Sequence, residues 1–347
     1  MHLLAHDYFT DRDDAPLGLA RVATRIAHHR SIAENCLLFD NGDLLQGNLF
    51  GDHLASAAPA AAPARGWRHP AIACLDRLGY DAATLGNHDF SWGLRALRQA
   101  LRGRRYPLTL ANARIRGGGD FFAPWVMLDR ALACDGGGRR DIRVGVIGFM
   151  PPQTPEWEPG LGGGLICDDV IDAARLHLPQ MRAAGCDIII ALCHGGIEPG
   201  PHRRNEENCA SALAALDVDA VIAGHTHLVF PGPDIPAAPD IDPLAGRLAG
   251  KPAVMPGFWG SHLGLIDLHL AHGETGWRLT GSEARAEPCA DQPPDPGLQA
   301  PVIASHHAAR RHFARRIGRS TTPLHSHFAQ LGHDAGLVLI AAASRWY

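Results

Sequence analysis

The sequence predicts an α/β fold in which parallel strands alternate with helices. Through much of the chain, short apolar runs alternate with segments whose apolar residues recur at helical spacing, and this alternation favours parallel pairing of the strands. Four of the apolar runs lead into a glycine-containing segment with side chains that can bind a metal ion. Open α/β sheets bind ligands at the carboxyl ends of their strands, so we expect these four segments to lie together.

Composition indicates a globular protein with a large core. The chain has 347 residues, of which 46% are hydrophobic and 20% charged, which suits one large domain or two smaller ones. The net charge of −4 gives no support for a broad nucleic-acid surface, and no apolar run is long enough to cross a membrane. Residues 1–7 lack the basic region and apolar core of a signal peptide, so the chain as written is expected to be cytoplasmic.

The cysteines are interpreted as buried thiols in a reducing compartment. The chain has eight, without any Cys-x-x-Cys spacing, and several lie in apolar runs. Disulfide pairing stays open at this point.

Apolar periodicity predicts the regular elements of the first part of the chain. The expected helices cover residues 16–30, 70–78, 94–101 and 169–184, the last capped by Asp168 or Asp169. The expected strands cover residues 36–39, 82–85, 108–110, 125–128, 144–149, 188–192 and 220–223. The Ala/Pro-rich residues 55–63 are expected to be an exposed loop or an irregular helix.

The pattern changes after His227. Pro and Gly dominate residues 231–243, and short strands at 253–255, 265–270 and 277–280 predict a second, antiparallel layer. A linker is expected at 291–301. Residues 302–319 are predicted to form a helix with five arginines and no acid; an anionic partner would fit it, but a solvated helix face is the favoured interpretation.

The segment Gly86-Asn87-His88-Asp89 follows the strand expected at 82–85. Gly86 allows a sharp turn, Asn87 offers an amide oxygen to a divalent ion, and His88 offers an imidazole that can bind a metal or move a proton. An ordinary loop, in which Asn and Asp make turns, is the alternative.

Three further strand ends repeat this arrangement. Asp43 lies in Asp40-Asn41-Gly42-Asp43, His194 in Cys193-His194-Gly195-Gly196, and His225 and His227 in Gly224-His225-Thr226-His227. Turn formation alone explains four such clusters poorly. Oxygen and imidazole ligands without a thiolate suit Mn, Fe, Zn, Ni or Co better than a Cys-based structural zinc site.

With these segments the chain resembles the calcineurin-like metallophosphoesterases, and among them the bacterial 2',3'-cyclic-nucleotide 2'-phosphodiesterase/3'-nucleotidase branch of the 5'-nucleotidase family. The matching segments are 42–47, Gly86-Asn87-His88-Asp89, His194, Gly224-His225-Thr226-His227, 229–233 and 255–264. The resemblance implies a four-layer α/β/β/α sandwich of two mixed sheets flanked by helices.

The resemblance also implies a role for each site residue. Asp43 corresponds to the residue that bridges two divalent metal ions, and His88 to the catalytic histidine. The implied ligands of one metal, besides Asp43, are Asn87, His194 and His225, and His227 belongs to the other. Substrate-binding residues are not assigned.

Three departures from the family pattern bear on these expectations. An Asp that orients the catalytic histidine in 5'-nucleotidases is replaced by Ser91, which favours the cyclic-nucleotide branch. The chain starts just after the position of the family's Asp-x-His metal ligands, and residues from Leu324 onward resemble the opening of a C-terminal nucleotide-binding domain. We therefore expect a catalytic domain at 1–290, a linker and helix at 291–320 and the start of a further domain at 321–347, truncated at both ends.

The resemblance implies a hydrolase that uses two divalent ions on small nucleotides, first of all 2',3'-cyclic ones, and by family a periplasmic location. A 5'-nucleotidase, another phosphatase or a nuclease of the same fold is the alternative. Another is an inactive remnant, because the second metal position would keep only Asp43 and His227. The chain as given is accordingly expected to hold one metal and to be poorly active.

Overall fold

The computed structural model describes residues 1–57, 67–118, 122–274, 276–325, 329–332 and 334–346. The chain divides into two compact units, Met1–Ala309 and Arg310–Tyr347. The larger unit carries all the predicted site residues and is described first.

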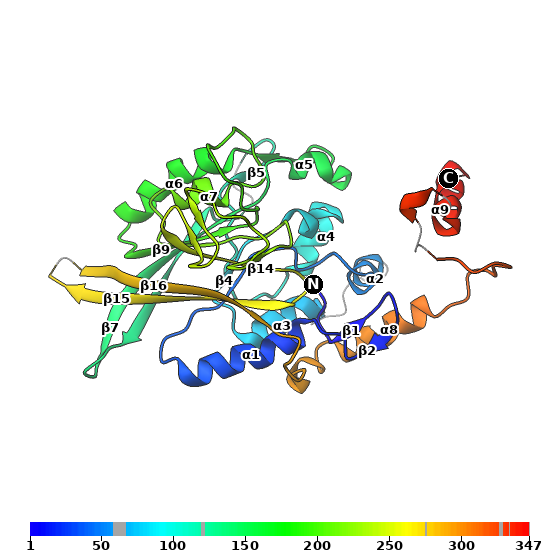
Figure 1. Cartoon of the computed structure of the whole chain (residues 1–347), viewed down its shortest axis with the longest axis horizontal. Helices are drawn as coiled ribbons and strands as arrows, with labels where there is room; N and C mark the ends of the chain where they lie inside the picture. Colours follow the sequence, from blue (N-terminus) through cyan, green and yellow to red (C-terminus); the bar gives the residue numbers. More distant parts are fainter. Residues whose placement is uncertain (58–66, 119–121, 275, 326–328, 333, 347) are drawn as a thin grey trace. The chain divides into compact units, whose positions relative to one another are not determined.

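A mixed eight-stranded sheet forms the centre of the larger unit (Figure 1). The strand order is β12-β13-β14-β10-β9-β7-β6, and β11 pairs with β14. Strands β7, β9, β10 and β14 run parallel, and β6 is antiparallel to β7. The strands are β6 (Trp125–Ala133), β7 (Arg139–Phe149), β9 (Ile188–Cys193), β10 (Ala220–Ile222), β11 (Val229–Phe230), β12 (Ile241–Asp242), β13 (Arg247–Leu248) and β14 (Lys251–Pro256).

Both faces of this sheet are covered. All six residues of β9 are buried, as expected for an apolar parallel strand with a layer on each side. On one face lie α6 (Val170–Ala183) and α7 (Ala210–Ala214), whose Met181 and Leu213 pack in one cluster with Ile189. On the other face, Ile190 packs with Leu268 of a second β layer.

The second β layer consists of two pieces. One is a parallel pair, β3 (Phe39–Asp40) and β4 (Ala82–Ala83), continued by single bridges from Ala83 to Leu108 and from Thr109 to Ala123. The other is the antiparallel hairpin of β15 (His262–Gly273) and β16 (Gly276–Pro288). The helices α1 (Leu19–Ile32) and α3 (Pro70–Leu78) lie beyond this layer (Figure 1). The four-layer α/β/β/α order expected from the sequence is confirmed.

Some strand predictions need correction. Of residues 36–39 only Phe39 is in a strand, and 108–110 make only single bridges. Residues 253–255 are part of β14 in the main sheet, where β10 is a parallel neighbour and β11 and β13 are antiparallel ones, so their assignment to a second layer was wrong. A short apolar run carries no information about the direction of its partner, because its period is the same in either pairing. The strands expected at 265–270 and 277–280 are confirmed as the hairpin.

The long helices agree with the predicted periodicity. Besides α1 and α3, α4 (Gly93–Ala100) lies within a residue of its expected bounds. The helix α2 (Leu49–Ala57) overlaps the start of the Ala/Pro-rich segment, whose residues 58–63 lie outside the described residues. Unpredicted elements include β1 (His6–Asp7), β2 (Arg12–Asp13), η1 (Asn87–Phe90), β5 (Ala113–Ile115), α5 (Thr154–Trp157), η2 (Pro159–Leu161), α7 and β8 (Leu165–Cys167).

The end of the larger unit packs on α1. In the segment expected to be a linker, η3 (Pro296–Leu298) buries Leu298, and the N–H of Asp295 donates to the carbonyl of Ala20 at 2.8 Å. The next helix, α8 (Ile303–Phe313), begins in this unit and stops six residues short of the expected Arg319.

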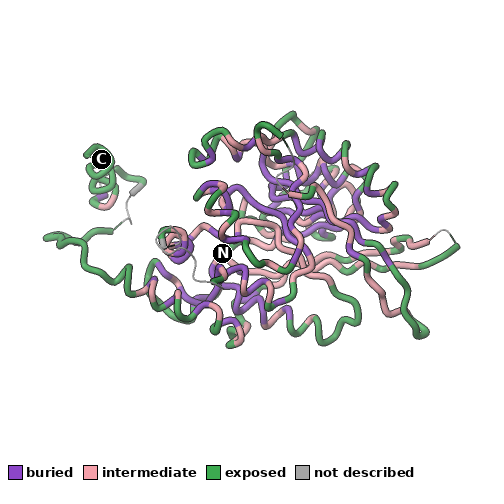
Figure 2. Tube along the Cα trace, turned by 180° about the vertical axis from the view of Figure 1, so that it is seen from behind, coloured by how far each residue is buried: buried purple, intermediate pink, exposed green. Residues whose placement is uncertain are grey.

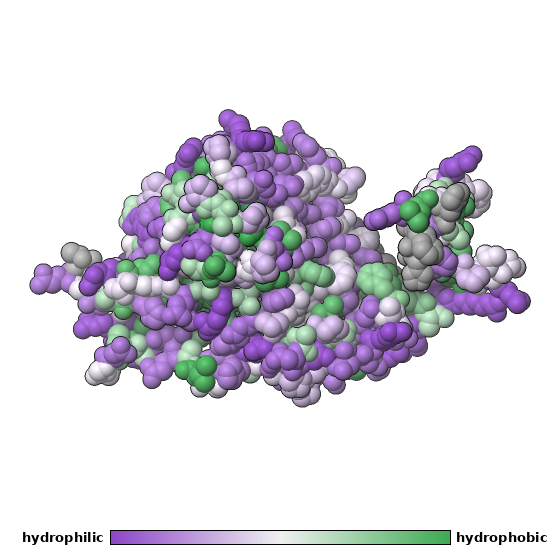
Figure 3. Space-filling model, in the orientation of Figure 1, coloured by the Kyte–Doolittle hydropathy of each residue, from purple (hydrophilic) through white to green (hydrophobic). Residues whose placement is uncertain are grey.

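The smaller unit contains η4 (Ala329–Leu331) and α9 (Ala335–Trp346). No helix in the described ranges has the length and apolarity needed to span a bilayer. Buried residues gather in the body of the larger unit (Figure 2), and on the face drawn in Figure 3 hydrophobic side chains lie scattered among hydrophilic ones. All eight cysteines are free, and five of them are buried.

The start of α6 identifies its cap as Asp169. Its buried Oδ1 accepts the N–H groups of Ile171 at 2.9 Å and Asp172 at 3.0 Å, and Oδ2 accepts that of Asn205 at 2.6 Å. Asp168 instead forms an exposed ion pair with Arg114.

Replacing Asp169 by alanine should lower the free energy of unfolding by about 1–2 kcal/mol, because three backbone donors lose their acceptor. The matched change Asp168→Ala removes an exposed ion pair and should cost less than about 1 kcal/mol. Urea unfolding of both variants measures this difference, and equal losses would contradict the assignment of the cap.

Candidate metal centre

Four strand ends bring the predicted ligands to one place. Asp43 follows β3, Asn87 and His88 open η1 after β4, His194 follows β9 directly, and His225 and His227 follow β10. Because β3 pairs in parallel with β4, and β9 with β10, each pair of strands ends at a common edge. All of these residues except the buried Asn87 line a single cavity.

A buried ion pair joins Asp43 and His194. The Nε2 atom of His194 lies 3.0 Å from Oδ2 of Asp43, and the side chains are 4% and 16% exposed. The Nδ1 atom lies 2.7 Å from the carbonyl oxygen of Asn41, to which it can donate its proton. That contact fixes the ring with Nε2 toward the carboxylate, the orientation required of a metal-binding imidazole.

The buried pair shifts the pKa of both members. Burial alone would lower the pKa of His194, but the charge of Asp43 outweighs it and raises the value to about 9. Burial opposes the charge of Asp43 as well, yet the imidazolium beside it leaves the pKa of that carboxyl well below its usual range. Without a metal, the pair is therefore a carboxylate and an imidazolium near neutral pH.

The remaining ligand candidates surround this pair. The buried Oδ1 of Asn87 has no hydrogen-bond partner. The ring centroid of His225 lies 5.5 Å from that of His194, and burial together with the His194 charge lowers the pKa of His225 to about 4. The pKa of His227 is lowered by burial. Both imidazoles are thus neutral at physiological pH, the form that binds metals.

His88 is held against the same carboxylate. Its backbone N–H donates to Oδ1 of Asp43 at 2.9 Å, and the residue borders the cavity. Ser91, which stands where an orienting Asp was sought, donates its hydroxyl to Glu158 at 3.1 Å. The structure therefore gives Ser91 a partner other than His88.

Asp89 has a role that sequence reasoning missed. Its buried carboxylate accepts the N–H of Asp43 at 2.8 Å, of Leu45 at 2.9 Å and of Gly86 at 3.0 Å. It therefore ties the loop after β3 to the loop after β4. The acid was visible in the sequence beside His88, but nothing local showed that its acceptors would serve a loop about 45 residues away.

Two glycines allow these loops to approach. A Cβ atom on Gly86 would lie 2.2 Å from Oδ1 of Asp43 and 2.6 Å from the His194 ring. Gly42 has a φ of 92°, and a Cβ there would lie 2.2 Å from the nitrogen of Gly86. Any side chain at either position would push the candidate ligands apart.

Three of the candidate ligands have left-handed backbone. The φ angles are 57° at Asp43, 70° at His225 and 65° at His227. This conformation is uncommon for residues other than glycine, and such strain concentrates at functional sites. It is independent support for the choice of these residues.

Two partly exposed aromatic side chains flank His225 and His227. The ring of Trp157 stacks on His225, with centroids 5.6 Å apart and planes 7° apart, and Phe258 stacks on His227 at 5.4 Å. Sequence reasoning assigned neither residue a role at the metals, because their stacking depends on loops from distant parts of the chain.

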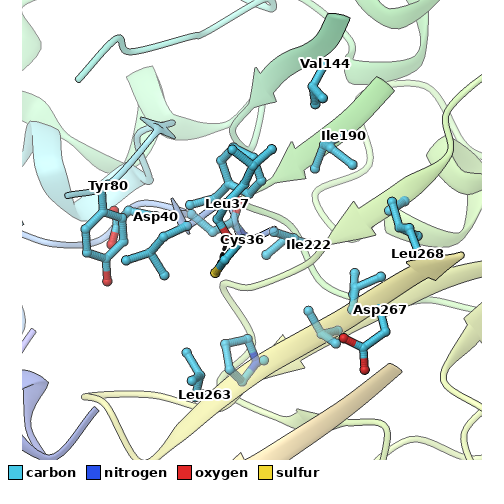
Figure 4. Close-up of a pocket in the computed structure, with 18 of the residues that line it drawn as sticks. Cys36, Leu37, Asp40, Tyr80, Val144, Ile190, Ile222, Leu263, Asp267 and Leu268 are labelled. Carbon is cyan, nitrogen blue, oxygen red and sulfur yellow. Dashed lines mark hydrogen bonds between the residues drawn. The ribbon is translucent and has the colours of Figure 1, made fainter. Parts of the chain in front are cut away.

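The cavity beside the ligands has a volume of about 1080 Å³. Its polar end is formed by the candidate ligands, and its walls come from the two β layers. Figure 4 shows Val144, Ile190 and Ile222 of the main sheet on one side and Leu263 and Leu268 of β15 on the other.

The residues present fit a divalent metal ion. Oδ1 of Asn87 is a buried polar atom without a hydrogen-bond partner, a costly state that a bound cation would relieve. The donor set of one carboxylate, one amide and three imidazoles suits Mn, Fe, Co, Ni or Zn.

Comparison with known proteins gives matches across the chain. A family model described as calcineurin-like phosphoesterase matches residues 6–229. The chain is 33% identical over 351 residues to the trifunctional nucleotide phosphoesterase protein YfkN of Bacillus subtilis, covering 100% of this chain and 24% of that protein. It is also 33% identical over 356 residues to the 2',3'-cyclic-nucleotide 2'-phosphodiesterase/3'-nucleotidase of Yersinia enterocolitica, covering 100% of this chain and 54% of that protein. The chain thus spans about half the length of the Yersinia relative and a quarter of the Bacillus one.

A solved structure has the same fold. The crystal structure of calcineurin-like phosphoesterase YfkN from Bacillus subtilis matches with a TM-score of 0.86 at 33% identity, covering 90% of this chain and 96% of that one.

Metal binding should release a proton from His194. Its pKa of about 9 in the metal-free protein means that the ring is protonated below pH 9 and must lose that proton to become a ligand. The apparent affinity for Mn²⁺ should therefore rise by up to about tenfold per pH unit between pH 6 and 8 and level off above about 9. Calorimetry in two buffers of different ionisation enthalpy counts the released protons, and binding without proton release at pH 7 would show that His194 is not a ligand.

Proposed function

The chain belongs to the calcineurin-like phosphoesterase family, and from this premise we propose that it hydrolyses phosphate esters of nucleotides with the help of two divalent metal ions. The observation that carries the proposal is the convergence of Asp43, His194, His225 and His227 on one cavity, together with the buried Oδ1 of Asn87, which has no hydrogen-bond partner. The names of the relatives support the nucleotide as substrate.

The metal-binding residues divide into two sets in this proposal. Asp43 has two carboxylate oxygens and can serve both ions, Asn87, His194 and His225 complete one site, and His227 contributes to the other. Bound divalent ions would neutralise the charge that develops on the phosphate oxygens during hydrolysis. The chain's own contribution is to hold these ligands in place, through Asp89, and to keep His225 and His227 neutral.

His88 is the proposed general acid. A sugar alkoxide is a poor leaving group, and an imidazolium that donates a proton to its oxygen removes this obstacle. The backbone of His88 is fixed by the N–H contact with Asp43, which keeps the residue beside the proposed metals without using its ring as a ligand.

The proposed substrates are 2',3'-cyclic nucleotides and then the 3'-nucleotides they yield. Opening the cyclic ring at its 2' bond leaves a 3'-monophosphate, and a second hydrolysis releases phosphate. Ser91 in place of an acid, the segments 229–233 and 255–264 and the name of the Yersinia relative support this choice. A 5'-nucleotidase or another phosphatase of the same fold is the second candidate.

The proposal also includes the boundaries of the domains. Residues 1–290 would form the catalytic domain and 321–347 part of a nucleotide-binding domain. Of the linker and helix proposed at 291–320, the residues up to Ala309 belong to the larger unit.

Replacing His88 by alanine should lower kcat by about a hundredfold or more, the usual loss for a general acid, and leave the metal content unchanged. The control Asp43→Ala should lose metal together with activity. Turnover of bis-p-nitrophenyl phosphate gives kcat, and elemental analysis of the purified variants gives the metal content. Loss of metal from the His88 variant would show that His88 is a ligand.

The protein should have a higher kcat/KM for 2',3'-cyclic mononucleotides than for 5'-mononucleotides. Phosphate release from 2',3'-cyclic AMP, with a coupled 3'-nucleotidase in excess, can be compared with release from 5'-AMP. Faster hydrolysis of 5'-AMP would favour the second candidate and leave the metal-dependent phosphohydrolase intact.

A further inference from the structure

We propose that His6, Asp13 and His306 form a second divalent-metal site, with a structural role and a preference for zinc-like ions. The three residues share none with the candidate metal centre. His6 lies in β1, Asp13 in β2 and His306 in α8, and Figure 1 shows these three elements side by side.

The donor atoms already lie close together. One ligand atom from each of the three residues is within 4.8 Å of the other two. Ligands that bind one zinc ion at about 2.0–2.2 Å lie up to about 4 Å apart, so closure needs a shift of about 1 Å. Asp13 can make this shift because its side chain is 79% exposed.

The two imidazoles are buried and held in place. His6 and His306 are only 1% and 5% exposed, with ring centroids 4.8 Å apart and planes at 86°. The hydroxyl of Tyr8 lies 2.8 Å from Nδ1 of His306, and its ring packs edge-on against His6 at 4.6 Å. Such neighbours fix the orientation of imidazole ligands at known metal sites.

The two nitrogens of His6 face two different carboxylates. Nε2 of His6 has no hydrogen-bond partner, although an imidazole nitrogen inside a protein is normally satisfied. The carboxylate of Asp11 lies 3.4 Å from it, and that of Asp13 lies 2.8 Å from Nδ1. Two imidazoles with adjacent carboxylates are the donors that zinc-like ions prefer.

A metal in this position would cross-link distant parts of the chain. It would join the hairpin of β1 and β2 to α8, whose His306 is 298 residues from Tyr8 in sequence. The larger unit ends at Ala309, within α8, so the ion would fix the end of the larger unit. Direct contacts of His6 with Asp11 and Asp13 are the competing explanation, and they require no metal.

The test is zinc binding in a protein whose candidate metal centre is disabled. In the background of Asp43→Ala with His194→Ala, we expect one Zn²⁺ per chain to remain after dialysis. Adding His306→Gln should remove that equivalent, whereas His307→Ala, which changes an exposed neighbour on the same helix, should retain it.

A milder variant decides the outcome if the His306 variant does not fold. Asp13→Asn changes an exposed side chain and should weaken zinc binding by at least about tenfold, measured by competition with a chelating dye, with the circular dichroism spectrum unchanged. The proposal would be overturned if the background protein bound no zinc. It would also be overturned if Asp13→Asn left the affinity for zinc unchanged. Either result would favour direct contacts of His6 with the two carboxylates.

Discussion

The buried carboxylate of Asp89 is the constraint on which the site depends. Three N–H groups from two loops converge on it, and these loops carry Asp43, Asn87 and His88. A carboxylate can satisfy several donors at once, whereas a neutral side chain of this size cannot. The loops are therefore held together before any metal binds, and the strand ends need only set the direction in which each loop leaves its strand.

This anchor also explains why strain and buried charge persist nearby. Left-handed backbone at Asp43, His225 and His227 is unfavourable by itself, and so is the removal of two charged groups from water at Asp43 and His194. At Asp43 the hydrogen bonds from Asp43 and Leu45 to Asp89 hold the loop in this conformation. The imidazolium can be regarded as occupying the place of a cation in the metal-free protein, since each neutralises the same carboxylate.

Much of the site could be predicted from the sequence because each ligand candidate directly follows an apolar run. The rule that ligands bind at the carboxyl ends of parallel strands then brought Asp43, His194 and His225 together without further information. What escaped prediction depends on long-range contacts: the anchoring by Asp89, the stacking of Trp157 on His225, and the parallel pairing of residues 253–255. None of these has a local periodicity, so sequence pattern alone cannot distinguish them from ordinary loop or strand residues.

The contact between Gly42 and Gly86 bears on how this protein can change over generations. The space at Gly42 is filled by the backbone of Gly86, and the space at Gly86 by the side chains of Asp43 and His194. A substitution at one glycine cannot be compensated by a smaller residue at the other, because both already lack a side chain. The two glycines therefore cannot be replaced by one substitution followed by a second that compensates for it. A packed core differs, because a large and a small residue there can exchange places. The two positions should therefore stay glycine in any lineage that keeps the site, while the helices around them are free to diverge.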